Sequence, residues 1–273
     1  MRILSCLIIL AVQCAPATAA LVAYDGINHS GVLRNNTPDM NLSSWNDQNN
    51  DGYQATTPGL SYDSLVVSGN KGIGGGGYTS AGTSIVMPAP WDPDNEWAPY
   101  RKRGPADSRY RAGKEGTVLW ASFLAEDWQS NDGYRVRFAD SHVGWNPGAY
   151  GAGVQVQNGN WQLQDLATGA FTDTGIARNI NETYLMVVKF EFLTGGSGED
   201  ATWDEGSDDV TLYVNPTPGL AAPDVSATTM SSSTDISLLN VHFRPGNGND
   251  EGAMDELRFG DTYADVTPVP EPG

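Results

Sequence analysis

The fold class is decided by the stretch Tyr184-Leu185-Met186-Val187-Val188-Lys189-Phe190-Glu191-Phe192. Large apolar side chains occupy every even-numbered position, whereas the odd-numbered positions form a mixed face that includes Lys189 and Glu191. This period of two is typical of an antiparallel strand that packs one face on a core. The same alternation recurs in shorter stretches at 134–138, 154–157 and 210–214.

The remainder of the chain also indicates an all-β protein. No segment carries an apolar stripe of helical period beyond two turns, and Gly, Asn, Asp and Pro separate the apolar runs. We therefore expect a single two-sheet antiparallel β-sandwich over 21–267, with long loops at 26–57 and 70–116 and a Pro-rich tail at 268–273. Further strands are predicted at 21–25, 60–67, 117–125, 160–166, 234–243 and 253–259.

The charge balance limits the kinds of partner. The 273 residues carry 15 Lys and Arg against 33 Asp and Glu, which gives a net charge of −18. A surface of this sign repels phosphate backbones, so nucleic acid is not expected as a partner, and neutral ligands or cations fit better. With 39% hydrophobic and 10% aromatic residues, the chain is too apolar for an acidic disordered protein.

Residues 1–20 have the features of an export signal. A positive Met1-Arg2 start precedes an apolar run over 3–12, and small residues follow at 17–20. The run is shorter than the roughly 20 residues that cross a bilayer, so no transmembrane segment is expected in the mature chain. Cys6 and Cys14 both lie inside the signal. The mature protein is therefore expected to be secreted or held at the cell surface, without disulfides.

One loop resembles the beginning of a calcium-binding loop. Asp47, Asn49 and Asp51 alternate with other residues and precede Gly52, so their side-chain oxygens can converge on a hard cation. The glutamate that completes an EF-hand is absent, because Pro58 stands at its position. A calcium site completed by backbone carbonyls and an ordinary Asn/Asp-rich surface turn both remain open.

A polar face is predicted on the strands of segment 133–164. If this segment is a three-strand meander, long amide and guanidinium side chains share one sheet face and suit glycans that carry hydroxyl or carboxylate groups. An ordinary solvated face is the alternative. Trp145, in a neighbouring loop, is either a platform for a sugar ring or a plug at the end of the core. The residues of this candidate glycan site are Arg135, Arg137, Gln155, Gln157, Gln162, Gln164 and Trp145.

No catalytic constellation stands out. The mature chain has no cysteine nucleophile and no G-x-S-x-G motif. Adjacent carboxylates occur at 126–127, 204–205, 208–209 and 255–256, and two of them could serve glycoside hydrolysis or simply lie on a solvated surface. A polysaccharide hydrolase or lyase that uses such carboxylates, or Arg135, Arg137 and Tyr134, therefore stays as an alternative to a non-catalytic protein.

Several short motifs resemble one known family. The clearest are Val210-Thr211-Leu212-Tyr213-Val214-Asn215-Pro216 and the later Asp255-Glu256-Leu257-Arg258-Phe259-Gly260. With Ala23-Tyr24-Asp25-Gly26 near the start, they resemble exported bacterial LamG-like proteins that carry PEP-CTERM sorting signals. The resemblance implies a concanavalin A-like jelly roll, and Val269-Pro270-Glu271-Pro272-Gly273 looks like the opening of the sorting signal itself.

The resemblance also implies a site and a function. In several concanavalin A-like proteins a calcium ion joins the first strand to the last, and the matching positions are Asp25 and Asp255; a structural role in which the acidic pair at 255–256 bonds Arg258 or loop amides is the alternative. We predict a non-catalytic secreted or cell-surface protein that binds or organises extracellular polysaccharide. A polysaccharide-degrading enzyme and a structural adhesion protein are the alternatives, and the oligomeric state stays open.

Overall fold

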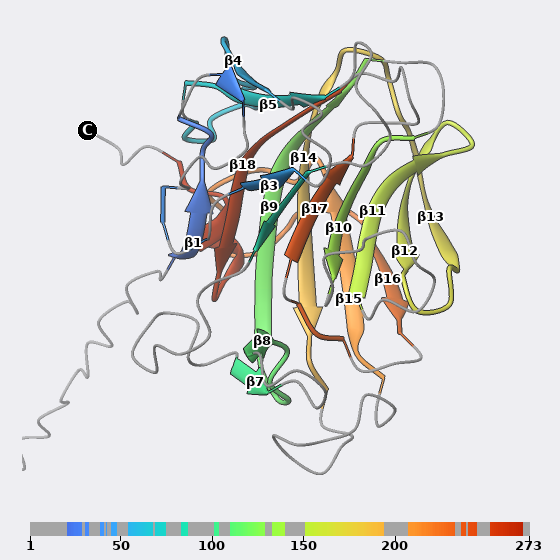
Figure 1. Cartoon of the computed structure of the whole chain (residues 1–273). Coiled ribbons are helices and arrows are strands. Elements are labelled where there is room, and N and C mark those ends of the chain that lie inside the picture. The colour runs from blue at the N-terminus through green and yellow to red at the C-terminus, as the bar shows by residue number, and fades with distance from the viewer. Residues whose placement is uncertain are drawn as a thin grey trace, which may run out of the picture.

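A computed structural model shows a β-sandwich of two antiparallel sheets (Figure 1). The prediction of an all-β, two-sheet jelly-roll sandwich is confirmed. Residues 1–20, which the sequence assigns to an export signal, lie outside the described residues. The structure describes residues 21–28, 31–32, 39–40, 42, 45–47, 54–67, 69–74, 83–86, 101–103, 110–128, 133–139, 151–193, 207–232, 236–238, 240–244 and 252–269.

The first layer is a nine-stranded sheet in which β18 pairs with β9 on one side and with both β5 and β1 on the other. Figure 1 shows the first strand, in blue, beside the last strand, in red. In spatial order its strands are β16 (Ala227–Ser231), β15 (Asp209–Val214), β14 (Thr183–Glu191), β9 (Val118–Asp127), β18 (Gly252–Gly260), β5 (Lys71–Gly74), β4 (Gln54–Thr56) and β2 (Gly31–Val32), with β1 (Leu21–Asp25) also on β18.

The second layer is a seven-stranded sheet whose middle is the predicted meander. Strands β10, β11 and β12 follow one another in sequence and in space, and β17 returns from the C-terminal part to pair with β10. In spatial order the strands are β13 (Phe171–Ala177), β12 (Asn160–Asp165), β11 (Gly151–Gln157), β10 (Arg135–Ala139), β17 (Asn240–Arg244), β6 (Thr83–Val86) and β3 (Trp45–Asp47). Outside the two layers lie the paired strands β7 (Arg101–Arg103) and β8 (Tyr110–Ala112) and the short helix α1 (Tyr263–Val266).

The alternating stretch at 184–192 behaves as its sequence predicts. Its even-numbered side chains are buried and point into the core between the sheets. There they meet aromatic rings of the second sheet: the ring centroids of Trp161 and Tyr184 are 5.2 Å apart, and those of Phe138 and Phe190 are 5.3 Å apart. Offset and edge-on contacts of this kind add to the gain from burying the rings.

The outer face of the nine-stranded sheet is also covered, which the alternation does not reveal. Leu185 and Val187, on the second face of β14, form a smaller apolar cluster with Leu60, Leu65 and other residues of 60–67 and α1. The second face of β14 is therefore buried at Leu185 and Val187, which explains the two apolar residues at odd-numbered positions, and it stays partly exposed at Lys189 and Glu191.

The prediction of a strand at 60–67 is wrong. The segment is an irregular cover in which Leu65 N–H donates to Tyr62 O at 3.0 Å and Asp63 has a φ of 41°, in the left-handed region. Leu60 N–H donates to the Asp255 carboxylate at 2.8 Å instead of joining a ladder. Its alternating apolar residues therefore reflect contact with the sheet, not pairing within it.

The predicted loops and tail also contain more structure than expected. Segment 26–57 includes β2, β3 and β4, and segment 70–116 includes β5 to β8, so neither is a loop throughout. At the C-terminal end, the backbone of Pro268 accepts a 3.0 Å hydrogen bond from Val66 N–H, and that of Thr267 accepts one of 2.9 Å from Gly219 N–H. Residues 267–269 therefore pack against the domain, and 270–273 lie outside the described part.

Strand β18 buries three charged side chains. Asp255 and Glu256 are 0% exposed and Arg258 is 2% exposed. The Arg258 guanidinium donates to the Glu256 carboxylate and to Val66 O, and it lies 5.2 Å from the centre of the Tyr24 ring. The Tyr24 hydroxyl donates to the same carboxylate at 3.0 Å. These contacts join β1, the 60–67 cover and β18.

Removing Arg258 should therefore cost much more stability than removing an exposed ion pair. Arg258→Ala leaves the Glu256 carboxylate buried without its counter-charge, and we expect the free energy of unfolding to fall by about 3–5 kcal/mol. Lys189→Ala, which breaks a partly exposed 2.7 Å pair with Glu191, should cost less than about 1 kcal/mol. Urea denaturation monitored by tryptophan fluorescence measures both values. Equal losses would contradict the role assigned to Arg258.

Candidate functional site

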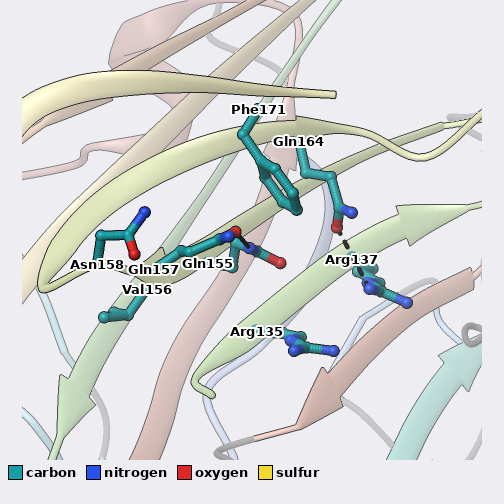
Figure 2. A pocket seen from close by; sticks show the side chains of 8 residues that line it. All are labelled: Arg135, Arg137, Gln155, Val156, Gln157, Asn158, Gln164 and Phe171. Atoms are coloured by element: carbon teal, nitrogen blue, oxygen red, sulfur yellow. Dashed lines mark hydrogen bonds between the residues drawn. The ribbon is translucent and has the colours of Figure 1, made fainter. Parts of the chain in front are cut away.

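The outward face of the seven-stranded sheet carries a pocket of about 410 Å³ at its β10–β13 end. Figure 2 shows Phe171 and Gln164 on one side of it and Arg135 and Arg137 on the other. The described lining includes no carboxylate. The residues that line the pocket are Arg135, Arg137, Gln155, Val156, Gln157, Asn158, Gln164 and Phe171.

The pocket gathers its residues because they lie in register on neighbouring strands. Arg137 on β10 is opposite Gly153 on β11, which is opposite Gln164 on β12, and this residue is opposite Phe171 on β13. Side chains of directly opposed residues point to the same face of a sheet. The row therefore runs across four strands and ends at an edge strand.

Gly153 allows its two neighbours in this row, Arg137 and Gln164, to meet. A Cβ atom at Gly153 would lie 3.3 Å from Cγ of Arg137 and 3.5 Å from Oε1 of Gln164. Without it, the Arg137 side chain lies across β11, and its Nη2 donates to Gln164 Oε1 at 3.2 Å. This contact, drawn in Figure 2, fixes the guanidinium in the pocket wall.

The glutamines of the meander form the remainder of the polar wall. Gln155 Nε2 donates to Gln157 Oε1 at 2.9 Å, and Gln162 Nε2 donates to the backbone oxygen of Gln157 at 3.3 Å. Gln162 lies opposite Gln155 on the same face, although it is not part of the pocket lining. The structure thus places five of the six predicted meander residues in one pocket and the sixth beside it.

Phe171 is a pocket residue that the sequence analysis missed. It is 42% exposed, and its strand alternates with outward positions at 171, 173, 175 and 177. The buried-side partner Ile176 packs on the core, so a phenylalanine at an outward position breaks the pattern of this strand. The sequence signal that could have pointed to Phe171 is this large ring at an outward position of the strand.

The pocket lining carries two arginines and no carboxylate among its described residues, although the chain as a whole is acidic. Arg244 lies opposite Arg135, and His242 lies opposite Arg137, so two pairs of basic side chains share this face. Burial first, and then the charges of Arg135 and Arg244, lower the pKa of Arg137 to about 10. Burial also lowers the pKa of Arg135. Guanidinium groups held this close favour an anion or a strong dipole beside them.

The calcium predictions have different outcomes. Asn49, Asp51 and Trp145 lie outside the described residues, and of Asp47 only its place in β3 is described. Within the described ranges, no group of three or more His, Cys, Asp or Glu side chains is arranged to hold a metal ion.

Asp25 and Asp255 do come close together, but their oxygens already serve the backbone. Asp25 Oδ1 accepts from Ile27 N–H at 2.9 Å, and the two oxygens of Asp255 accept from Leu60 N–H and Glu256 N–H at 2.8 Å each. Burial first, and then the Glu256 charge, raise the pKa of Asp255 to about 8, with Asp25 adding to the shift. This set of residues does not fit a calcium ion, and the contacts follow the structural alternative.

The Asp255 carboxyl should make stability fall as pH rises. Because its pKa in the folded state lies above the ordinary aspartate value of 3.8, the folded protein keeps a proton that the unfolded chain releases. The free energy of unfolding should therefore decrease between about pH 4 and about pH 8. In Asp255→Asn this decrease should be smaller, whereas Asp63→Asn at an exposed position should keep it. Urea denaturation at intervals across this range measures the slopes, and identical slopes in all three proteins would contradict the assignment.

The carboxylate pairs and Tyr134 have structural roles where they are described. Asp127 forms a 2.6 Å ion pair with Arg178, and Asp208 accepts from Leu193 N–H and Ile236 N–H at 2.8 and 2.6 Å. Tyr134 is 0% exposed, and its hydroxyl donates to Ala253 O at 2.9 Å inside the core. It cannot act on a ligand at the outward face, so the alternative that gave Tyr134 a catalytic role is not supported. The pair at 204–205 lies outside the described residues.

Comparisons with known proteins show distant likenesses only. No family model and no curated protein matches the chain. Among solved structures, it is similar to an endo-β-1,4-glucuronan lyase from the fungus Trichoderma reesei, with 9% identity, a TM-score of 0.44, and coverage of 88% of this chain and 98% of that one. A protein of unknown function from Shewanella oneidensis MR-1 matches with 14% identity, a TM-score of 0.44, and coverage of 95% and 93%.

A third neighbour is the exoplasmic/lumenal domain of VIP36 in a form bound to Ca²⁺ and Man3GlcNAc, with 8% identity, a TM-score of 0.41, and coverage of 87% and 90%. At these identities and scores, what the three proteins bind or act on is not transferred to this chain. None of the described residues forms a helix with the length and apolar composition needed to cross a bilayer.

Proposed function

We propose that this chain is a non-catalytic protein that binds extracellular polysaccharide in the pocket on the outward face of the seven-stranded sheet. The observation that carries the proposal is the combination of an exposed ring, Phe171, with the amide and guanidinium groups of Gln164 and Arg137 in one pocket. Amide and guanidinium groups supply directional donors and acceptors for sugar hydroxyls. The ring offers a flat apolar surface to the C–H face of a pyranose.

The size and setting of the pocket support the same proposal. Its volume of about 410 Å³ lies within the range of small-ligand sites, roughly 300–1,000 Å³. Two lining residues are exposed, Asn158 in the β11–β12 turn and Phe171 on the edge strand β13, so the pocket is accessible to a polymer from solvent. Secretion or display at the cell surface, proposed from the export signal, would bring this pocket to extracellular glycans.

Phe171→Ala should weaken polysaccharide binding. Loss of the ring removes its stacking surface without disturbing the core, because the side chain is 42% exposed. We expect roughly a tenfold increase in Kd, corresponding to about 1.4 kcal/mol. Leu220→Ala is the matched control. It truncates an apolar side chain that is 40% exposed and does not line the pocket, so this variant should bind as the wild type does.

The measurement is affinity electrophoresis or a glycan array that includes both neutral and acidic polysaccharides. Retention that is equal in wild type and Phe171→Ala would place the binding elsewhere. No retention of the wild type on any polysaccharide would reject the function itself.

Calcium binding stays a prediction for the loop at 47–51. If that loop binds calcium, the melting temperature should be higher with calcium than with a chelator, because a ligand that binds only the folded state stabilises it. Asp47→Ala should remove the difference, whereas Asp255→Asn should keep it. Differential scanning calorimetry measures the shift, and identical melting curves with calcium and chelator would reject the site.

A further inference from the structure

Four basic side chains are arranged as two cross-strand pairs on one sheet face. Arg135 lies opposite Arg244 and Arg137 lies opposite His242, with β10 and β17 running antiparallel. Successive positions on one face of a strand are about 6.6–6.8 Å apart, and neighbouring strands are about 4.8 Å apart. The four side chains therefore originate within a small area, and Arg135 and Arg137 extend from it into the pocket.

This concentration of positive charge contrasts with the composition of the chain. The protein carries 33 acidic and 15 basic residues, yet three arginines converge here and the described pocket lining contains no carboxylate. Burial, followed by the charges of Arg135 and Arg244, lowers the pKa of Arg137. The guanidinium groups of Arg135 and Arg137 line the pocket and supply charged hydrogen-bond donors to it.

We propose that the pocket takes a carboxylate-bearing sugar of the uronic acid class, with its carboxylate on Arg135 and Arg137 and its ring on Phe171. This inference rests on the proposed function and narrows it from polysaccharides in general to polyuronates. The planar guanidinium group is suited to a carboxylate, because it can donate two parallel hydrogen bonds to the two oxygens. Arg137 Nη2 donates to Gln164 Oε1 at 3.2 Å, and this hydrogen bond orients the guanidinium group in the pocket.

The lining also gives the sugar a direction in the pocket. Arg135 and Arg137 lie on β10, in the interior of the sheet, whereas Phe171 lies on the edge strand β13. The charged group of the ligand would thus lie toward the middle of the sheet and its apolar face toward the edge. Gln155 and Gln157 lie on β11 between these two ends and are placed to reach ring hydroxyls.

The test compares polyuronates with their own carboxyl-reduced forms. The probes are polymers of glucuronate, galacturonate and mannuronate/guluronate and the neutral polymers made from each by reducing the carboxyl groups, which keeps the backbone. Binding of the full chain is measured by isothermal titration calorimetry at one fixed ionic strength. We expect at least one polyuronate to bind about tenfold or more tightly than its reduced form, as loss of a charge-assisted hydrogen bond predicts.

Arginine variants test the location of the carboxylate. Arg137→Gln and, separately, Arg135→Gln remove one charge each and keep an amide, so each should weaken polyuronate binding about tenfold and change binding of the reduced polymer much less. Lys114→Gln makes the same change of charge at an exposed residue outside the pocket and should bind as the wild type does. Melting temperatures show whether each variant is folded. If Arg137→Gln does not fold, Arg135→Gln still tests the inference, because Arg135 is less buried than Arg137.

The possible outcomes separate the two proposals. Equal affinity for a polyuronate and its reduced form, with both lost in Phe171→Ala, would overturn the carboxylate inference and leave polysaccharide binding in place. Polyuronate binding that falls equally in Arg137→Gln and Lys114→Gln would show attraction by general charge and would also overturn it. Absence of binding to all polymers would overturn both proposals.

Discussion

The whole sandwich depends on how β18 buries three ionisable side chains. The strand is buried along its full length and pairs with β9, β1 and β5, yet it carries Asp255, Glu256 and Arg258. Buried charges are tolerated only when each finds a counter-charge or several hydrogen bonds. Here Arg258 bonds Glu256, and two backbone N–H groups bond Asp255. This network links the first strand, the last strand and the 60–67 cover.

The outer faces of the two sheets differ in what they contact. The nine-stranded sheet is covered on its outer face by 60–67 and α1, so in the described part both of its faces contribute to stability. The seven-stranded sheet packs its inner face on the core, and its outer face carries polar side chains at the β10–β13 end. A ligand site needs side chains that the core does not use, and this face supplies them.

Sequence patterns predict the fold well where one periodic signal acts alone. Alternation at 184–192 and in the meander gives strands with the correct faces, because a strand places every second side chain on the core. The pattern fails at 60–67, where contact with a sheet imitates pairing in a sheet. It also cannot show that Asp255 is buried, since the carboxylate's environment comes from Leu60, far away in the chain. The sequence predicts that the arginines and glutamines of the pocket share one sheet face. It does not predict that Phe171 borders the pocket, because this depends on the pairing of β13 with β12.

The net charge of the chain and the charge of its pocket act over different distances. At physiological ionic strength, exposed charges are largely screened beyond about 8 Å, so the excess of acidic residues has little effect on a group already inside the pocket. It does oppose the approach of a polyanion, which means that long-range attraction cannot be the source of affinity. Binding of an acidic sugar must then come from direct contacts with Arg135, Arg137 and Phe171. Such contacts depend on the position of the carboxylate relative to the ring, so a pocket of this kind selects for the geometry of the sugar more than for the charge density of the polymer.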